Sequence, residues 1–210
     1  MKKILLLLLV ALYWGGLRAQ AQEIKLGVST GMNISSPSKL DSKLGFNVGA
    51  KGELQFPNSM YLELGLSLSS KGWKSKGYYD TTTQETKTWE GTPYYLEIPL
   101  HLGYKVSAGE NFKILGSVGP YAGLGLFGKS TYRVESKNKV VKTTTSDNLF
   151  KDKLQERFDW GVGANLGVEI HNHYQLSLGY NLGLKNIYKK EKGQGDSKNR
   201  VFNVSFAYLF

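Results

Sequence analysis

The stretch YYLEIPLHLGYKV, residues 94–106, places an apolar side chain at every even-numbered position and mostly polar or small residues at the odd ones. Successive side chains of a β-strand point to opposite faces, so this period of two describes a strand with one apolar and one polar face. The same parity recurs along the chain. It predicts eight strands, at 24–34, 46–56, 60–68, 94–106, 112–126, 158–170, 174–184 and 202–210.

The odd-numbered face of these strands carries glycines mixed with charged residues such as Lys51, Glu53 and Glu169. A water-facing strand surface of a soluble protein is depleted in glycine, so glycine on this face indicates a crowded interior. An eight-stranded barrel has a lumen that side chains fill, which suits small residues interleaved with paired charges. A soluble eight-stranded barrel or sandwich, with its apolar face inward, has the same period and stays an alternative.

The N-terminus has the features of a secretory signal peptide. Lys2 and Lys3 precede an apolar run, and Ala19-Gln20-Ala21 offers a small-x-small cleavage site. We therefore expect a signal peptide at 1–21 and one barrel domain at 22–210. Because the chain has no cysteine, neither a disulfide scaffold nor a lipid-anchored cysteine is expected.

The connections between the predicted strands alternate in length. The short ones are 57–59, 107–111 and 171–173. The long ones are 35–43, 71–93, 129–157 and 187–199. Outer-membrane barrels have this pattern, with short turns in the periplasm and long loops outside. It predicts an antiparallel up-and-down transmembrane barrel of a Gram-negative outer membrane, with both chain ends in the periplasm.

Aromatic residues lie at both ends of the predicted apolar face. At the turn end these are Phe56, Tyr104, Phe112, Tyr174, Tyr208 and Phe210, and at the loop end Phe46, Tyr94, Phe158, Trp160 and Phe202. Two aromatic girdles around an aliphatic band are typical of a bilayer-spanning barrel, because these rings settle at the headgroup level. Their placement favours the membrane barrel over the soluble alternative.

The last strand, VFNVSFAYLF at 201–210, resembles the C-terminal signal that the barrel-assembly machinery recognises in Gram-negative outer membranes. Ser205 stands where that signal usually has an interior glycine. The resemblance implies that this machinery is a partner during insertion.

Four further motifs carry a family resemblance. They are YYLEIPLHLGYKV at 94–106, VGPYAGLGL at 118–126, FDWGVGANLGVEI at 158–170 and YNLGLKNI at 180–187. With Lys198-Asn199-Arg200 before the last strand, they resemble the PorT-like family of small outer-membrane β-barrel proteins. The family name comes from a component linked to protein secretion, so the resemblance implies a membrane barrel and, as one alternative, a place in a secretion complex.

Glu97 lies on the lumen face beside Pro99, which lacks the N–H that a sheet ladder needs. Pro99 therefore predicts a bulge or a local break in pairing, with its ring toward the lumen. Glu97 has two interpretations, a gating or binding residue or an interior salt-bridge partner. We favour the second, with Lys51, Lys105 or Lys185 as the partner, because buried charges must be paired.

The three histidines give no catalytic site. His171 and His173 occupy a tight turn and His101 points into the lumen, so none lies beside an outward serine at the loop end. Glu169 could approach the two turn histidines, but we interpret His171 and His173 as turn residues rather than metal ligands. The segment GLGLFGK at 123–129 resembles a phosphate-binding loop but lies in a strand. We expect no catalytic, metal or cofactor-binding residues.

The long loops are the expected place of function. Residues 129–157 hold eight basic and four acidic residues, and 189–200 hold five and two, which predicts contact with lipopolysaccharide phosphates. A nucleic-acid partner does not fit an exported chain without a continuous basic stripe. Residues 71–93 carry Trp73, Tyr78, Tyr79 and Trp89 among threonines, which indicates either an adhesive or sugar-binding surface or a self-packed loop.

The sequence thus predicts a non-enzymatic outer-membrane barrel that serves envelope structure or surface interaction. Two alternatives stay open: a component of a secretion or assembly complex, and a narrow channel, provided that the lumen charges do not bridge it.

Overall fold

The computed structural model describes residues 23–210 except 39, 137–138, 148, 151–154 and 188–196, so the expected signal peptide lies outside the described residues. The chain forms eleven strands: β1 Glu23–Ser35, β2 Asp41–Gln55, β3 Met60–Ser70, β4 Trp73–Lys74, β5 Tyr78–Asp80, β6 Glu85–Ser107, β7 Phe112–Ser136, β8 Lys139–Ser146, β9 Phe158–Ile170, β10 Tyr174–Asn186 and β11 Lys198–Leu209. Within the described residues there is no helix that is long and apolar enough to span a membrane.

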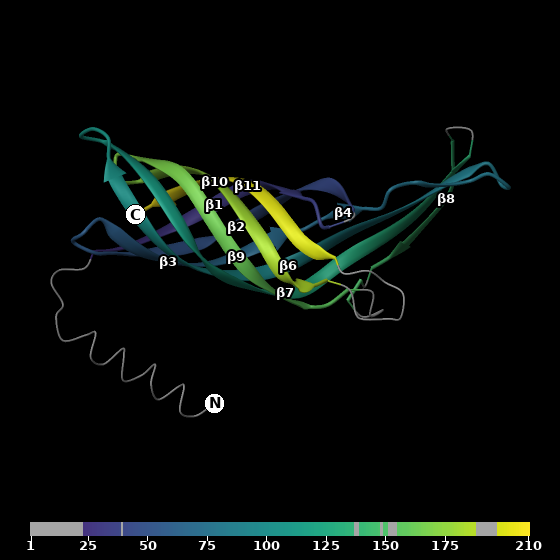
Figure 1. The fold of residues 1–210 in the computed structure, drawn as a ribbon, viewed down its shortest axis with the longest axis horizontal. Coiled ribbons are helices and arrows are strands. Elements are labelled where there is room, and N and C mark those ends of the chain that lie inside the picture. The colour runs from purple at the N-terminus through teal and green to yellow at the C-terminus, as the bar shows by residue number, and fades with distance from the viewer. Residues whose placement is uncertain (1–22, 39, 137–138, 148, 151–154, 188–196) are drawn as a thin grey trace, which may run out of the picture.

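Eight of the strands form the predicted closed antiparallel barrel. β1, β2, β3, β6, β7, β9, β10 and β11 each pair with the next in this order, and β11 pairs with β1 to close the ring. Figure 1 shows the tilted strands of the barrel and a narrow sheet that continues from one end of it. The predicted fold class is confirmed.

The strands are staggered around the ring. A circuit from Ile24 along paired residues returns to β1 at Ile34, ten residues farther along. It passes through Leu54, Leu62, Leu102, Val118, Ala164, Tyr180 and Phe202. Ten residues span about 33 Å of strand, which at a tilt of about 40° is about 25 Å of height. β1, which contains both ends of the circuit, is therefore long enough to cross the apolar band of an outer-membrane protein.

The even-numbered residues of the barrel strands face outward, as the parity predicts. This face holds large exposed apolar side chains along every barrel strand, for example Val28, Val48, Leu64, Leu102, Val118, Leu166, Leu178 and Phe206. A protein in water does not expose so continuous an apolar surface. The surroundings of this face are therefore apolar.

The inward glycines make room for large rings in the lumen. A Cβ at Gly103 would overlap the ring of Tyr61, and a Cβ at Gly125 would overlap the ring of Phe150. Tyr61 is buried at 1% exposure. The predicted crowding of the lumen thus has a specific cause, since aromatic side chains lie directly over glycine backbone.

All four predicted long loops are partly strands, which corrects the expectation for 35–43, 71–93, 129–157 and 187–199. β6 begins at Glu85 and β7 runs to Ser136, and β5 and β8 pair with their outer edges. We call this projecting sheet, made of β5, β8, residues 85–93 of β6 and residues 127–136 of β7, the tongue. In the loop 35–43, β1 runs to Ser35 and β2 begins at Asp41, and in the loop 187–199, β11 begins at Lys198. We call the opposite end of the barrel, where the short turns and the C-terminus lie, the turn end (Figure 1).

Pro99 interrupts the ladder between β3 and β6 without changing its register, because Leu64 pairs with Leu100 and Ser67 with Glu97. This is the local break in pairing that the proline predicts. A bulge lies elsewhere, where Tyr94 pairs with Phe127 but Tyr95 pairs with Gly125. The bulge marks the boundary between barrel and tongue.

A charge placed on the outward face tests the membrane assignment. Val118 lies midway along the circuit from Ile24 to Ile34, whereas Leu44 lies at the tongue end of β2, and their exposures are close, 61% and 64%. We expect Val118→Arg to lower the free energy of unfolding by about 2–4 kcal/mol and Leu44→Arg by at most about 1 kcal/mol. Urea unfolding in lipid vesicles measures both. Equal effects would contradict the assignment, because only a bilayer distinguishes the two depths.

Candidate functional site

The lumen near the turn end contains an ionic layer made of Lys51, Glu53, Glu63, Lys105, Glu169 and Gln175. Lys105 Nζ lies 2.5 Å from carboxylate oxygens of both Glu53 and Glu169. Gln175 Nε2 donates to the same two carboxylates at 2.8 Å. Because the residues of this layer come from β2, β3, β6, β9 and β10, the layer ties five strands together across the lumen.

Lys51 joins this layer from β2. Its Nζ contacts Glu63 Oε2 at 2.5 Å and Glu53 Oε1 at 3.1 Å, and it donates to Gln175 Oε1 at 2.9 Å. Each ammonium therefore has at least two partners. Burial of charge is tolerated when every charged group has such hydrogen bonds, and removal of one partner is then costly.

A second ionic layer lies nearer the tongue and consists of Lys71, Glu97 and Asp159. Lys71 is 0% exposed and its Nζ pairs with Glu97 and, at 2.8 Å, with Asp159 Oδ2. Asp159 Oδ2 also accepts hydrogen bonds from Tyr121 Oη and Asn199 Nδ2. The Lys71 ammonium lies over the Tyr121 ring, 4.6 Å from its centroid, where a cation–π contact adds to the ion pairs.

The salt-bridge interpretation of Glu97 is right, but its predicted partners are wrong. Lys51 and Lys105 belong to the layer at the turn end, and Lys185 lies 3.4 Å from Glu156. The true partner, Lys71, lies at the start of the segment 71–93, which the sequence predicts to be a loop. β3 extends two residues beyond the predicted end, to Ser70, so Lys71 follows directly on a barrel strand. Its backbone lies four residues beyond Ser67, the residue that pairs with Glu97, and its long side chain reaches back into the lumen to the Glu97 carboxylate.

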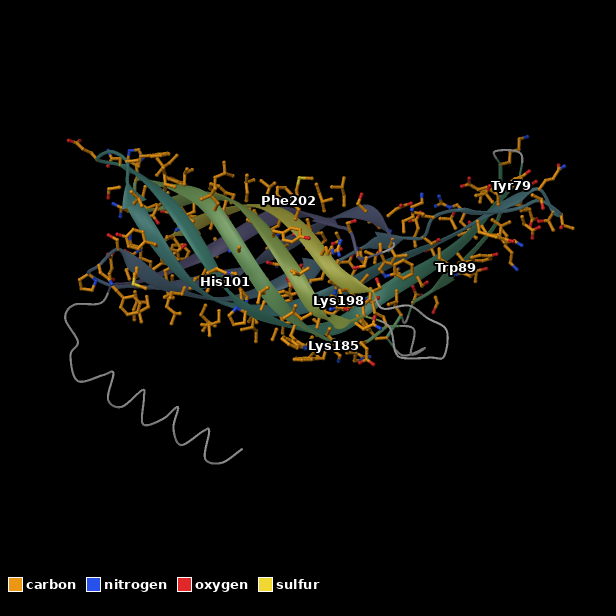
Figure 2. The ribbon with its side chains drawn as sticks, viewed as in Figure 1. Tyr79, Trp89, His101, Lys185, Lys198 and Phe202 are labelled. Atoms are coloured by element: carbon orange, nitrogen blue, oxygen red, sulfur yellow. The ribbon has the colours of Figure 1, made fainter. Side chains whose placement is uncertain are left out.

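Between the two ionic layers lies a cavity of about 120 Å³ lined by amide and hydroxyl groups, including Asn33, Asn47, Ser117, Asn165, Asn181 and Asn203. His101 points into the lumen here, as predicted, and its Nδ1 lies 3.1 Å from Asn165 Nδ2 (Figure 2). Since charges from opposite strands meet above and below this cavity, they bridge the lumen.

Residues of the predicted loop 129–157 return into the tongue end of the barrel. Leu149 and Phe150 are buried, and the Phe150 ring meets that of Tyr95 edge-on at 5.7 Å. Trp73 Nε1 donates to Gln155 Oε1 at 3.3 Å. These side chains cover the second ionic layer, that of Lys71, Glu97 and Asp159, at the tongue end of the lumen. Sequence reasoning missed them, although Leu149-Phe150 is an apolar pair within a polar segment.

The turn histidines have structural contacts. His171 and Asn172 have φ of 52° and 61°, as the two central residues of a type I′ turn require, and His173 Nδ1 lies 2.7 Å from the Leu209 carbonyl oxygen. Glu169 is engaged by Lys105. No group of three or more His, Cys, Asp or Glu suited to hold a metal occurs within the described residues.

The tongue has two different faces. On one face the rings of Trp89 and Tyr132, a cross-strand pair, lie 4.6 Å apart. Tyr78 is on this face because it pairs with Lys87, two residues from Trp89, whereas Tyr79 pairs with Thr86 and lies on the other. Trp89 is 51% exposed and Tyr78 67%. Of the four aromatics noted in 71–93, only Trp73 is packed inside, so the self-packing interpretation fits that residue alone.

The tip of the tongue is held by Asp80. Its carboxylate accepts hydrogen bonds from Lys87 Nζ at 2.9 Å and from the backbone N–H of Thr82 at 3.0 Å and Thr83 at 3.4 Å. These donors, Lys87 first, lower the pKa of Asp80 below its ordinary 3.8. The hydrogen bond with Asp80 raises the pKa of Lys87.

Removal of the buried Lys71 ammonium tests the structural role of the second ionic layer. Lys71→Met leaves Glu97 and Asp159 buried without their shared cation, and we expect the free energy of unfolding to fall by about 3–5 kcal/mol. The matched control is Lys87→Met, which breaks a partly exposed pair with Asp80 and should change stability little. Heat-modifiable gel migration after urea titration measures both. A Lys71 variant as stable as the wild type would show that the layer is not a structural tie.

The tongue tip has an expected pH response. A carboxyl with a lowered pKa stabilises its surroundings above its ordinary pKa and loses this effect as the pH falls through the folded value. We therefore expect the amides of Thr82 and Thr83 to be protected from hydrogen exchange at neutral pH and to lose protection below about pH 4. Asp80→Asn should remove the pH dependence. Protection that persists to pH 1 in the wild type would contradict the role of the carboxylate.

Structural comparison finds other small membrane barrels at low similarity. Ail, the attachment invasion locus protein of Yersinia pestis, is 15% identical, with 90% of this chain and 99% of that chain covered and a TM-score of 0.39. Neisserial surface protein A is 10% identical, with 91% of this chain and 100% of that chain covered and a TM-score of 0.42. A major outer membrane protein from Thermus thermophilus is 14% identical, with 89% of this chain and 99% of that chain covered and a TM-score of 0.45. Likenesses this weak carry no statement about function.

No curated protein sequence matches the chain. The family model described as "Outer membrane protein beta-barrel domain" matches residues 19–189, which include seven of the eight barrel strands. With the closed ring and the outward apolar face, this match indicates an integral barrel of the outer membrane. The chain belongs to the outer membrane protein beta-barrel domain family.

Proposed function

We propose that this protein is a non-enzymatic surface-interaction protein of the outer membrane and that its tongue is the element that binds. The observation that carries the proposal is the exposed pair of Trp89 and Tyr132 on a sheet that projects beyond the barrel. β6 continues nine residues beyond Tyr94, which is about 30 Å of strand. A barrel that served envelope structure alone would not need a paired sheet of this length.

The chemistry of the aromatic tongue face suits a carbohydrate. Trp89 and Tyr132 offer ring faces, and Thr144 pairs with Tyr132 and adds a hydroxyl beside them. Aromatic rings combine an apolar body with a polar edge and lose little entropy on binding, so they are effective contact residues. The apolar C–H face of a sugar ring stacks on such rings while neighbouring hydroxyls bind its oxygens.

We also propose that the protein is a member of the PorT-like family. This proposal rests on sequence motifs such as 94–106, which forms the barrel part of β6 and supplies Glu97. It keeps a secretion or assembly complex as the alternative function, with the turns and the barrel-assembly machinery on the periplasmic side as points of contact. The channel alternative is weakened, because Lys51, Lys105 and Lys71 bridge the lumen in two layers.

Substitutions on the two faces of the tongue test the proposal. The probe is an array of bacterial and host oligosaccharides, screened with the full barrel in detergent. We expect Trp89→Ser to weaken binding at least tenfold, because truncation of an aromatic anchor removes most of its contact. Tyr79→Ser is the matched control, since Tyr79 is similarly exposed, at 56%, but lies on the other face.

The control should bind like the wild type. Absence of any bound oligosaccharide with the wild type, or equal losses in the two variants, would contradict a carbohydrate site on the aromatic face. A stable protein partner that copurifies in mild detergent would instead favour the secretion alternative.

A further inference from the structure

The outward face of the barrel carries charge at one place. Lys198 and Arg200, at the extracellular end of β11, are the only charged residues at outward, even-numbered positions of the described barrel strands, apart from the tongue. Both side chains are exposed. Figure 2 shows Lys198 at the end of the barrel where the tongue begins, with Phe202 farther along the barrel. This position is unlike that of the lumen cations, which are all inside the ring.

The height of this pair is set by the register. Phe202 is the last apolar outward residue of β11 toward the tongue end and belongs to the aromatic residues at that end of the apolar face. Arg200 and Lys198 lie two and four residues farther out, about 7 and 13 Å along the strand. The pair is therefore at the level of the lipid headgroups, where phosphates are found.

The backbone at this pair is fixed. Ser36 N–H donates to the Arg200 carbonyl at 2.8 Å, and Ser38 N–H donates to the Lys198 carbonyl at 3.1 Å. Leu182 pairs with Arg200 and presents an apolar side chain beside it. The two cations are thus held next to each other on one face, with apolar groups beneath them.

Neither cation has a carboxylate partner among the described residues, whereas other lysines near this rim do. Lys43 lies 3.1 Å from Glu90 Oε2, and Lys185 lies 3.4 Å from Glu156 Oε2. A cation beside lipid is costly unless it meets an anion. At this height on the outward face, a lipid phosphate can supply that anion.

We propose that Lys198 and Arg200 form a binding site for a phosphate group of lipopolysaccharide in the outer leaflet. The guanidinium of Arg200 offers paired donors that match two phosphate oxygens, and the Lys198 ammonium adds a third contact. The acyl chains of the same lipid lie against Phe202 and Leu182. The site is independent of the carbohydrate role of the tongue.

The test uses the full barrel in neutral detergent, titrated with bisphosphorylated lipid A and with the same lipid after removal of its phosphates. Bound lipid is counted by native mass spectrometry. Each basic residue near an anionic lipid contributes about fivefold, so the double variant Lys198→Ser, Arg200→Thr should bind lipid A about 25-fold more weakly. The wild type should bind the dephosphorylated lipid as weakly as the variant binds lipid A.

The matched control is Lys139→Ser, Lys142→Ser, which removes two exposed cations from the tongue and changes the net charge equally. It should keep the affinity of the wild type, contrary to the expectation that the basic residues of 129–157 contact lipopolysaccharide phosphates, because β8 lies at the far end of the tongue, away from the barrel (Figure 1). Equal weakening in this control, or equal binding of the two lipids by the wild type, would overturn the proposal. Equal affinity for phosphatidylglycerol would overturn the assignment to lipopolysaccharide. The comparison of the two lipids needs no variant, so it holds even if the double variant does not fold.

Discussion

The closed hydrogen-bond ladder is the constraint on which the rest of this structure depends. Inside a bilayer no water is present to satisfy an unpaired N–H or C=O, so a sheet can cross only if it has no edge. The pairing of β11 with β1 removes that edge. With eight strands and a stagger of ten residues, the tilt and the small lumen follow.

A lumen of this size must be filled from the odd-numbered positions, and the filling has an order. Ionic groups form two layers, one around Lys105 and one around Lys71, with amides between them and an apolar cap of Leu149 and Phe150 at the mouth. Each layer joins strands that are not neighbours in the ring. The lumen therefore acts as a set of cross-ties, and its charges are explained by stability without any gate.

Much of this could be predicted from residue parity, because in a membrane barrel the two faces have different solvents. β9 begins and ends at the predicted residues, 158 and 170. What parity cannot give is height, since it says which face a residue is on but not which residues meet across the lumen. For this reason parity predicts correctly that Glu97 faces the lumen but does not identify the lysine with which it pairs. Its partner became visible only with the register of β3 and β6.

The tongue escaped prediction for a related reason. Beyond the bulge at Tyr94 and Phe127 both faces of β6 and β7 lie in water, so residues such as Thr86, Lys87 and Thr88 show no apolar period. The hydrogen-bond ladder is nevertheless the same one that closes the barrel. Backbone pairing thus carries the sheet past the point where the bilayer stops selecting side chains. The side chains of the tongue are then free of the outward parity that the bilayer requires of the barrel strands.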